Sequence, residues 1–102
     1  GVNRAVALTA LGRLREADAA LTDAEHEYGN AGAEVRRHLL AARAELAWRR
    51  GRAAEAAAAS EQALSIWADT DTSDARRARL IVLRQRSAWC AKTRRFGDQT
   101  MR

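Results

Sequence analysis

The feature that most constrains this chain is an internal repeat. The pattern G-R-x-x-E-A-x-A-A begins at Gly12 and begins again at Gly51, 39 residues later. An alanine-rich chain produces some matches by chance, but a shared Gly-Arg and a shared Glu-Ala at one spacing exceed that background. A period of roughly 20–50 residues is typical of arrays in which each unit buries one face against its neighbour.

Further matches extend the repeat in both directions. Segments that begin eight residues before each glycine resemble one another, and a third related segment follows later: 4–8 (RAVAL), 43–47 (RAELA) and 86–90 (RSAWC). We therefore expect one repeat at about residues 1–30, a second at about 33–69 and a partial third at about 74–93. Together they form one module of residues 1–92, followed by a frayed tail at 94–102 that has no face to bury.

The composition places this repeat in the all-α class. The chain has 102 residues and no proline, about a quarter of it is alanine, and leucine, arginine and glutamate supply much of the rest. These residues favour helices, whereas the β-branched and aromatic residues that favour strands are sparse.

Glycine positions and apolar spacing predict helices at 2–11, 14–28, 33–50, 53–68 and 74–93. A loop at 70–73 ends in an N-cap before the last helix. We expect the buried faces to carry residues at three- and four-residue spacing: Ala17, Leu21, Ala24 and Tyr28; Val35, Leu39, Ala42 and Leu46; Ala56, Ala59, Ala63 and Trp67; Ala78, Val82 and Trp89 beside Leu80, Leu83 and Cys90.

At these positions the chain resembles the tetratricopeptide repeat family over about residues 1–92. The matching residues are a small residue and large apolar residues before each turn glycine, then an alanine five residues after it: Ala5, Leu8, Gly12, Ala17, Leu21 and Ala24; Leu40, Ala44, Ala47, Gly51, Ala56, Ala63 and Leu64. The resemblance implies a right-handed α-α superhelix of stacked antiparallel helix pairs, about two and a half repeats long. The chain departs from the family in its 39-residue spacing rather than 34, in lacking a proline after each repeat, and in Arg4, Arg43 and Arg86, where the family has leucine.

A second, looser resemblance concerns the parent protein. Phrases such as LGRLREADAAL and AELAWRRGRAAEA are similar to helical arrays that precede caspase-like (CHAT) peptidase domains in bacteria, and to arrays in large bacterial regulators. This resemblance implies a part of a larger regulatory protein whose catalytic domain lies outside these residues.

The tetratricopeptide resemblance also implies where a partner binds. In that family the first helix of each pair lines a concave surface that holds a peptide or helix. The corresponding positions here are Asn3, Val6, Ala10, Ala41, Ala88 and the main candidates His38, Glu45, Trp48, Arg49, Arg84 and Lys92. The alternative is that these residues form an ordinary solvated helix face. Few repeats also leave apolar ends, so we expect either a homodimer through those ends or a fragment of a longer array.

The remaining residues do not form a convincing active site. Trp67 and Trp89 are expected to pack in the core, Trp48 at the edge between core and groove, and Cys90 as a buried thiol. His26 and His38 lack the converging ligands that a metal needs, so no metal or other cofactor is expected, nor an enzyme. A single cysteine favours a reducing, cytoplasmic location, and no apolar run is long enough for a membrane span.

The net charge of +5 leaves one alternative function open. Arg36, Arg43 and Arg50 recur every seven residues, and a denser basic cluster lies at 76–86. A basic helical domain that binds nucleic acid or regulates transcription would show this charge. However, basic and acidic residues alternate along most of the chain, and no phosphate-binding glycine loop accompanies them. The sequence therefore favours a non-catalytic protein–protein interaction or scaffold module.

Overall fold

The computed structural model describes residues 2–67 and 75–100, with side chains through Arg94, and within them the chain is all-helical. The helices are α1 (Val2–Ala10), α2 (Leu14–Tyr28), α3 (Ala33–Arg49), α4 (Ala53–Ile66) and α5 (Ala75–Thr100). No helix in this part of the chain combines the length and the apolar character needed to cross a membrane.

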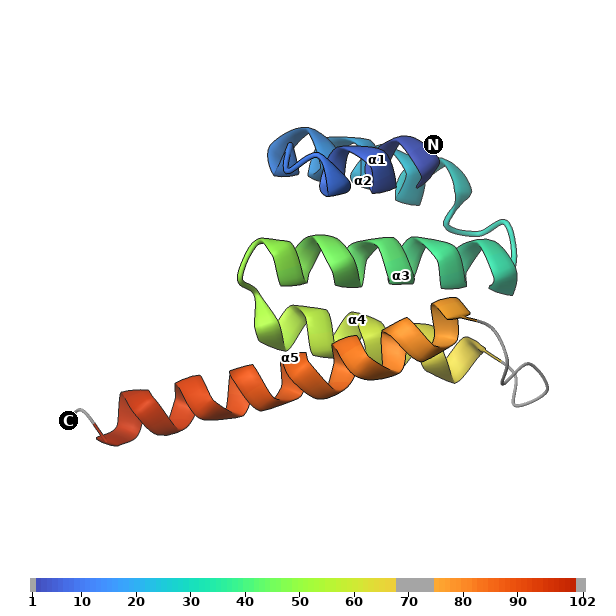
Figure 1. The fold of residues 1–102 in the computed structure, drawn as a ribbon. Helices are drawn as coiled ribbons and strands as arrows, with labels where there is room; N and C mark the ends of the chain where they lie inside the picture. Colours follow the sequence, from blue (N-terminus) through green and yellow to red (C-terminus); the bar gives the residue numbers. More distant parts are fainter. Residues whose placement is uncertain (1, 68–74, 101–102) are drawn as a thin grey trace.

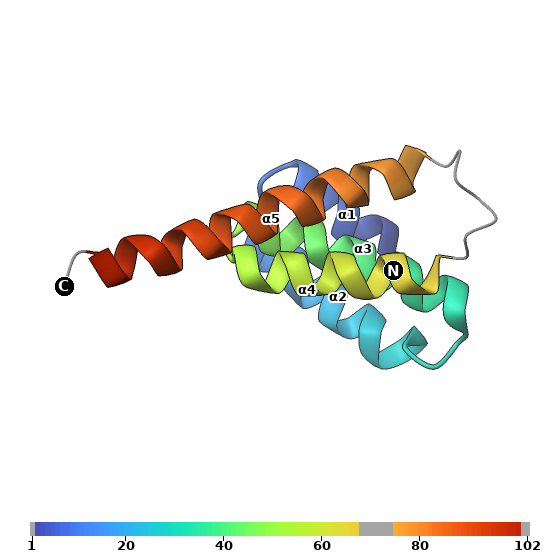
Figure 2. The same cartoon turned by 90° about the horizontal axis from the view of Figure 1, so that it is seen from below.

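The helices form three layers, with α3 in the middle. In Figure 1, α1 and α2 lie above α3, and α4 and α5 lie below it. The helices α1, α3 and α5 run in the same direction, and α2 and α4 run back between them. The middle helix α3 contacts all four other helices. Figure 2 shows α4 and α5 side by side at the lower end of the stack, with α5 projecting beyond it.

The repeated Gly-Arg pair builds the same turn twice. Gly12 and Gly51 have φ angles of +79° and +75°, a left-handed conformation that side chains disfavour. After each glycine, the arginine N–H donates to the carbonyl five residues earlier, from Arg13 to Leu8 and from Arg52 to Ala47, both at 2.9 Å. This arrangement closes the end of a helix and redirects the chain, so the sequence repeat reflects a repeat of backbone geometry.

Two hydrophobic cores separate the layers. The first lies between the α1–α2 pair and one face of α3, and its buried residues are Ala5, Leu8, Ala17, Leu21, Ala24, Leu39, Ala42 and Leu46. The second lies between the other face of α3 and the α4–α5 pair, and its buried residues are Ala44, Ala59, Ala63, Trp67, Leu80 and Leu83. The helix α3 is therefore buried on two faces.

An arginine joins α3 to α2 beside the first core. Arg43 Nη1 donates to Asp18 Oδ1 at 2.5 Å, and its Nη2 donates to Glu25. Arg50 approaches the other Asp18 oxygen at 3.4 Å. The arginine at this repeat position therefore carries an inter-helix ion-pair network, where the resemblance led us to expect leucine.

Most predicted helix limits agree with the structure to within one or two residues, the usual uncertainty of helix ends. The predicted end at Thr93 is wrong, because α5 continues to Thr100. No proline interrupts this stretch, and a single glycine costs a helix only about 1 kcal/mol. The predicted loop at 70–73 with its N-cap, the helix limits at 68 and 74, and residues 101–102 of the predicted tail lie outside the described residues.

The predicted buried faces of α2, α3 and α4 are largely confirmed, apart from the exposed Tyr28 and the partly buried Val35. The prediction for α5 is wrong in three places. Trp89 and Val82 are 70% and 45% exposed, and Ala78 is exposed too. The residues that α5 buries are Leu80, Leu83 and Ser87, while Cys90 is only partly buried.

The burial pattern also corrects the register of the third repeat. The sequence match aligned Arg43 with Arg86, an offset of 43 residues, which would pair buried Leu46 with exposed Trp89. An offset of 41 residues instead pairs Leu39, Ala42 and Leu46 with Leu80, Leu83 and Ser87, all of them buried. The arginine in α5 that corresponds to Arg43 is therefore Arg84.

Candidate functional site

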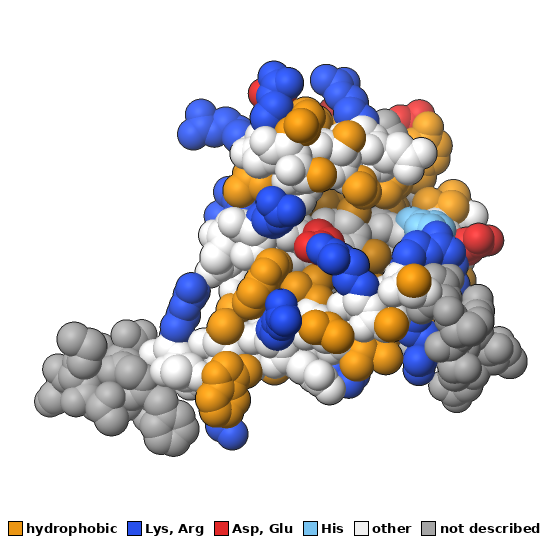
Figure 3. All heavy atoms as spheres, viewed as in Figure 1, with side chains coloured by type: hydrophobic (Ala, Val, Ile, Leu, Met, Phe, Trp, Pro, Cys, Tyr) orange, Lys and Arg blue, Asp and Glu red, His pale blue; other side chains and the backbone are white. Residues whose placement is uncertain are grey.

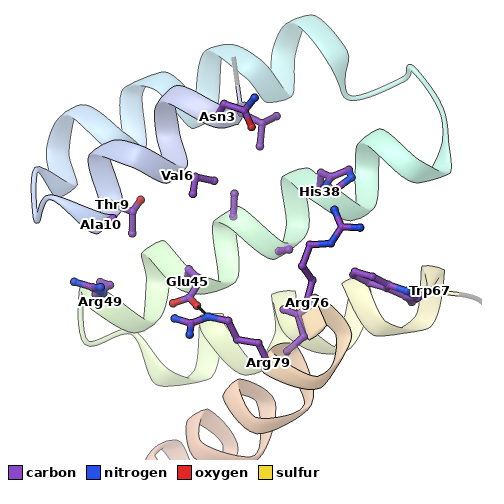
Figure 4. Close-up of a pocket in the computed structure, with 14 residues that line it drawn as sticks. Asn3, Val6, Thr9, Ala10, His38, Glu45, Arg49, Trp67, Arg76 and Arg79 are labelled. Carbon is purple, nitrogen blue, oxygen red and sulfur yellow. Dashed lines mark hydrogen bonds and ion pairs between the residues drawn. The ribbon is translucent and has the colours of Figure 1, made fainter. Parts of the chain in front are cut away.

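A groove of about 500 Å³ lies on the face of the stack formed by α1, α3 and α5. We call it the α1–α3–α5 groove, and Figure 4 shows the side chains that line it. The helix α1 contributes Val2, Asn3, Val6, Thr9 and Ala10, and α3 contributes His38, Ala41, Ala42, Glu45 and Arg49. The lower wall consists of Trp67, at the end of α4, with Arg76, Arg79 and Leu80 of α5.

The lining follows from helical spacing. Positions three or four apart lie on one side of a helix, so His38, Glu45 and Arg49 lie along the same side of α3 although they are far apart in sequence. Because α1, α3 and α5 are parallel neighbours, their aligned sides form one continuous surface (Figure 1). The partly exposed Val6 and the buried Leu80 give this surface an apolar upper and lower wall.

One ion pair spans the groove from α3 to α5. Arg79 Nε donates to Glu45 Oε1, as the dashed line in Figure 4 marks. The hydrogen bond to Glu45 raises the pKa of Arg79 above its ordinary value, so this guanidinium is charged throughout the physiological range. The Glu45 side chain is 25% exposed and that of Arg79 is 71% exposed. Much of the Arg79 side chain therefore remains accessible to a ligand.

Trp67 lies at the end of the groove and carries cations on its ring. The guanidinium of Arg37 lies 3.9 Å from the ring centroid, and that of Arg76 lies 5.6 Å from it. Such contacts attract a cation to the aromatic face and are worth roughly 0.5–2 kcal/mol. The Trp67 side chain is 4% exposed, so the predicted core packing of this residue is confirmed, and it also positions an arginine of the groove.

The charges around the groove are mainly positive. Arg49, Arg76 and Arg79 line it together with one carboxylate, that of Glu45. In Figure 3, which shows this side of the molecule, lysine and arginine side chains outnumber acidic ones, and the acidic group in the middle of the face lies next to a basic one. The groove therefore combines an apolar lining with an excess of guanidinium groups.

The structure brings together three of the six main candidates from the sequence, His38, Glu45 and Arg49. Asn3, Val6, Ala10 and Ala41 lie with them in the groove. Trp48 does not belong to the lining, because its side chain packs against the second core.

Arg84, Ala88 and Lys92 of α5 are also outside the lining. The reason is the slope of α5, which begins near α3 and moves away from it toward its C-terminal end (Figure 1). Only its first turns reach the groove.

Sequence reasoning missed Arg76, Arg79, Leu80 and Trp67 as groove residues. A usable signal was present, because an offset of 41 residues aligns Arg79 with His38 and Leu80 with Leu39. The shared arginine at position 86 instead suggested the offset of 43. Chemical identity misled the alignment because the arginines are numerous, whereas the spacing of the leucines was informative.

The described residues contain no group of three or more His, Cys, Asp or Glu side chains arranged to hold a metal ion. Cys90 has a free thiol and lies on α5, away from the groove lining. No protein-family model, no curated protein and no solved structure matches this chain.

Proposed function

We propose that this chain is a non-catalytic protein–protein interaction module, with a tetratricopeptide-like α-α superhelix as its scaffold. The 39-residue repeat of turn geometry and the contacts of α3 with both neighbouring helix pairs support this assignment. Its place in a larger regulatory or CHAT-type protein, and its cytoplasmic location, remain predictions from the sequence.

The observation that carries the proposal is the α1–α3–α5 groove. Its occupant, we propose, is a segment of a partner protein that carries an apolar side chain next to aspartate or glutamate. The apolar part would contact Val6 and Leu80, and the carboxylates would pair with Arg49 and Arg79. Bonds between a guanidinium and a carboxylate are charge-assisted and give orientation as well as affinity. A volume of about 500 Å³ is within the range typical of ligand sites.

A displayed library of short random peptides, selected on the purified chain, tests this function. We expect enriched peptides to combine acidic and apolar residues. Val6→Arg places a bulky cation in the groove at a position that is 51% exposed, so the fold should tolerate it. This variant should weaken binding by about tenfold or more, or about 1.4 kcal/mol.

Leu11→Arg is the matched control, because Leu11 is 71% exposed and lies outside the groove. Its binding of the selected peptides should equal that of the unmodified chain. Peptides that bind both variants equally well would contradict the assignment of the groove, and a selection without enrichment would contradict the function.

The second candidate function is nucleic-acid binding, and the basic surface of α5 favours it. Between Ala75 and Arg94 this helix has seven basic residues and no acidic one. Several of these cations, however, already have partners in the fold: Arg79 pairs with Glu45, and Arg94 donates to the Gly51 carbonyl at 2.6 Å. Retention on heparin and duplex DNA that falls steeply with salt would favour this alternative.

A further inference from the structure

The exposed tryptophan on α5 identifies a second binding surface, distinct from the groove. The helices α3 and α5 hold equivalent places in the stack, related by 41 residues. On α3, one stripe faces the preceding helix pair through Leu39, Ala42 and Leu46, and a second stripe faces α4. On α5, the first stripe is buried as Leu80, Leu83 and Ser87, whereas the second is not buried.

The second stripe of α5 has nearly the same chemistry as that of α3. Leu40, Ala44, Ala47 and Trp48 of α3 correspond to Ile81, Gln85, Ala88 and Trp89 of α5. Trp48 packs against the second core, whereas Trp89 is 70% exposed, and the neighbouring Val82 is 45% exposed. Figure 3 shows hydrophobic side chains along the lower edge of the molecule, where α5 runs. We call Val82, Gln85 and Trp89 the α5 outer face.

The helix that covers this stripe on α3 shows what would fit on α5. That helix is α4, which presents alanines to the second core, among them Ala59 and Ala63. Small side chains let two helix backbones approach closely, so that the large side chains of one helix pack against the backbone of the other. Between Ala53 and Ile66, α4 also carries two acidic residues, Glu55 and Glu61, and no basic one.

Charge selects among the helices that could occupy the α5 outer face. Basic side chains flank this face, with Arg84 and Arg86 beside Gln85 and Lys92 beyond Trp89. Two copies of the chain that met through this face would bring two strongly basic helices together, which like-charge repulsion disfavours. The alanine stripe of α4 in a second copy is unavailable, because α3 and α5 already bury it.

We propose that the α5 outer face docks an α-helix of a partner protein, in the manner in which α4 docks on α3. The docked helix has a stripe of small residues and a net negative charge. Gln85 occupies the position of Ala44, which is fully buried. Since a buried amide requires hydrogen-bond partners, the docked helix also presents a polar residue opposite Gln85. Trp89 is the apolar anchor, as is common for tryptophan at interfaces.

The test uses a synthetic peptide with the sequence of residues 53–66, the α4 sequence, added to the full ¹⁵N-labelled chain. We expect saturable NMR shifts centred on Val82, Gln85 and the Trp89 indole. Because a short isolated helix must fold as it binds, we expect a Kd on the order of 0.1–1 mM. A control peptide with Glu55→Lys and Glu61→Lys should bind about tenfold more weakly at low salt.

Trp89→Ala in the chain should also weaken binding by about tenfold, while Leu11→Ala, at an equally exposed position, should leave it unchanged. Val6→Arg should have no effect, which separates this surface from the groove. Four results would overturn the proposal: equal binding of the lysine peptide, shifts that map to the groove or to α3, displacement of the peptide by duplex DNA, or Trp89 shifts that depend on the chain's own concentration. The last would identify a second copy as the occupant, and light scattering would show it as a dimer.

Discussion

The two junctions that hold the three layers together use different chemistry at equivalent places. Between α2 and α3, Arg43 reaches Asp18 and Glu25 beside a core rich in leucine. Between α4 and α5, the repeat offset places Ala57 and Leu64 where α2 has Asp18 and Glu25. This second junction consists of alanines, leucines and Trp67.

The difference shows that the repeat conserves geometry rather than particular contacts. Both junctions follow a glycine turn with the same hydrogen bonds, so the chain enters each layer in the same way. What then fills the space differs: large side chains and an ion-pair network in the first junction, small side chains that allow close approach in the second. The two junctions should therefore respond to opposite kinds of substitution.

The largest effect is expected from removing volume in the first core. Leu46 is 1% exposed and lies between α3 and the α1–α2 pair. Leu46→Ala should lower the free energy of unfolding by about 3 kcal/mol, because it removes buried apolar surface and leaves a cavity. Urea denaturation followed by circular dichroism measures this loss. Leu11→Ala, at an exposed position, should change the value by less than about 0.5 kcal/mol.

Adding volume should be the more damaging change in the second core. Ala63 is fully buried on α4, and Ala63→Leu should destabilise the chain by about 2 kcal/mol because no space exists for three further carbon atoms. Ala58→Leu is the control, since Ala58 is an exposed residue of the same helix with the same helix propensity change. If both variants unfold at the same urea concentration, the second junction is not closely packed at Ala63.

The ion-pair network of the first junction should have a smaller effect. Arg43→Met keeps most of the apolar stem but leaves the Asp18 and Glu25 carboxylates without their shared cation. We expect a loss of about 1–2 kcal/mol, between the values for exposed and buried pairs, because the Arg43 side chain is 18% exposed. The matched variant is Arg84→Met, at the corresponding position of α5. A comparable loss for Arg84→Met in urea denaturation would break the contrast between the junctions.

The smallest effect concerns pH. The hydrogen bond from Arg43 lowers the pKa of the Asp18 carboxyl below its ordinary value; burial opposes this shift, and the charges of Arg43 and Arg50 add to it. A lowered pKa in the folded state means that the contribution to stability is complete above the unfolded pKa of about 3.9 and is lost as pH falls below it. Because the Asp18 side chain is 39% exposed, solvent screening should keep this contribution below about 1 kcal/mol.

Thermal melts between neutral pH and acid measure this contribution. Asp18→Asn should lose less stability than the unmodified chain when pH falls below about 4. Arg43→Met should flatten the pH dependence in the same way, because the pKa shift depends on that cation. An unchanged slope in both variants would show that other carboxylates dominate acid unfolding.

Much of the fold could be predicted from local sequence. The helix starts at Leu14, Ala33 and Ala53 agree with the structure, because glycine turns and apolar spacing act over a few residues. The buried stripes of α2, α3 and α4 were predicted because each has one apolar side at helical spacing. In the groove, His38, Glu45 and Arg49 could be grouped for the same reason, since all three belong to one helix.

The errors lie where two apolar stripes compete on one helix. On α5, Leu80 and Leu83 form one apolar stripe and Val82 and Trp89 form another, and periodicity alone does not decide which is buried. Packing against α3 and α4 decides it, and Trp89 becomes exposed as a result. The choice of Arg76 and Arg79 rather than Arg84 and Lys92 for the groove has the same origin, because it depends on the slope and rotation of α5.

The sequence by itself determined the all-helical class, the turns at Gly12 and Gly51, and the faces of the helices with a single apolar stripe. These features arise from interactions between residues close in the chain. Only the tertiary structure decided the ion-pair partners of Arg43, the pairing of Arg79 with Glu45, and the exposure of Trp89. Each of these involves side chains from separate helices, whose relative rotation and tilt result from packing of the whole stack.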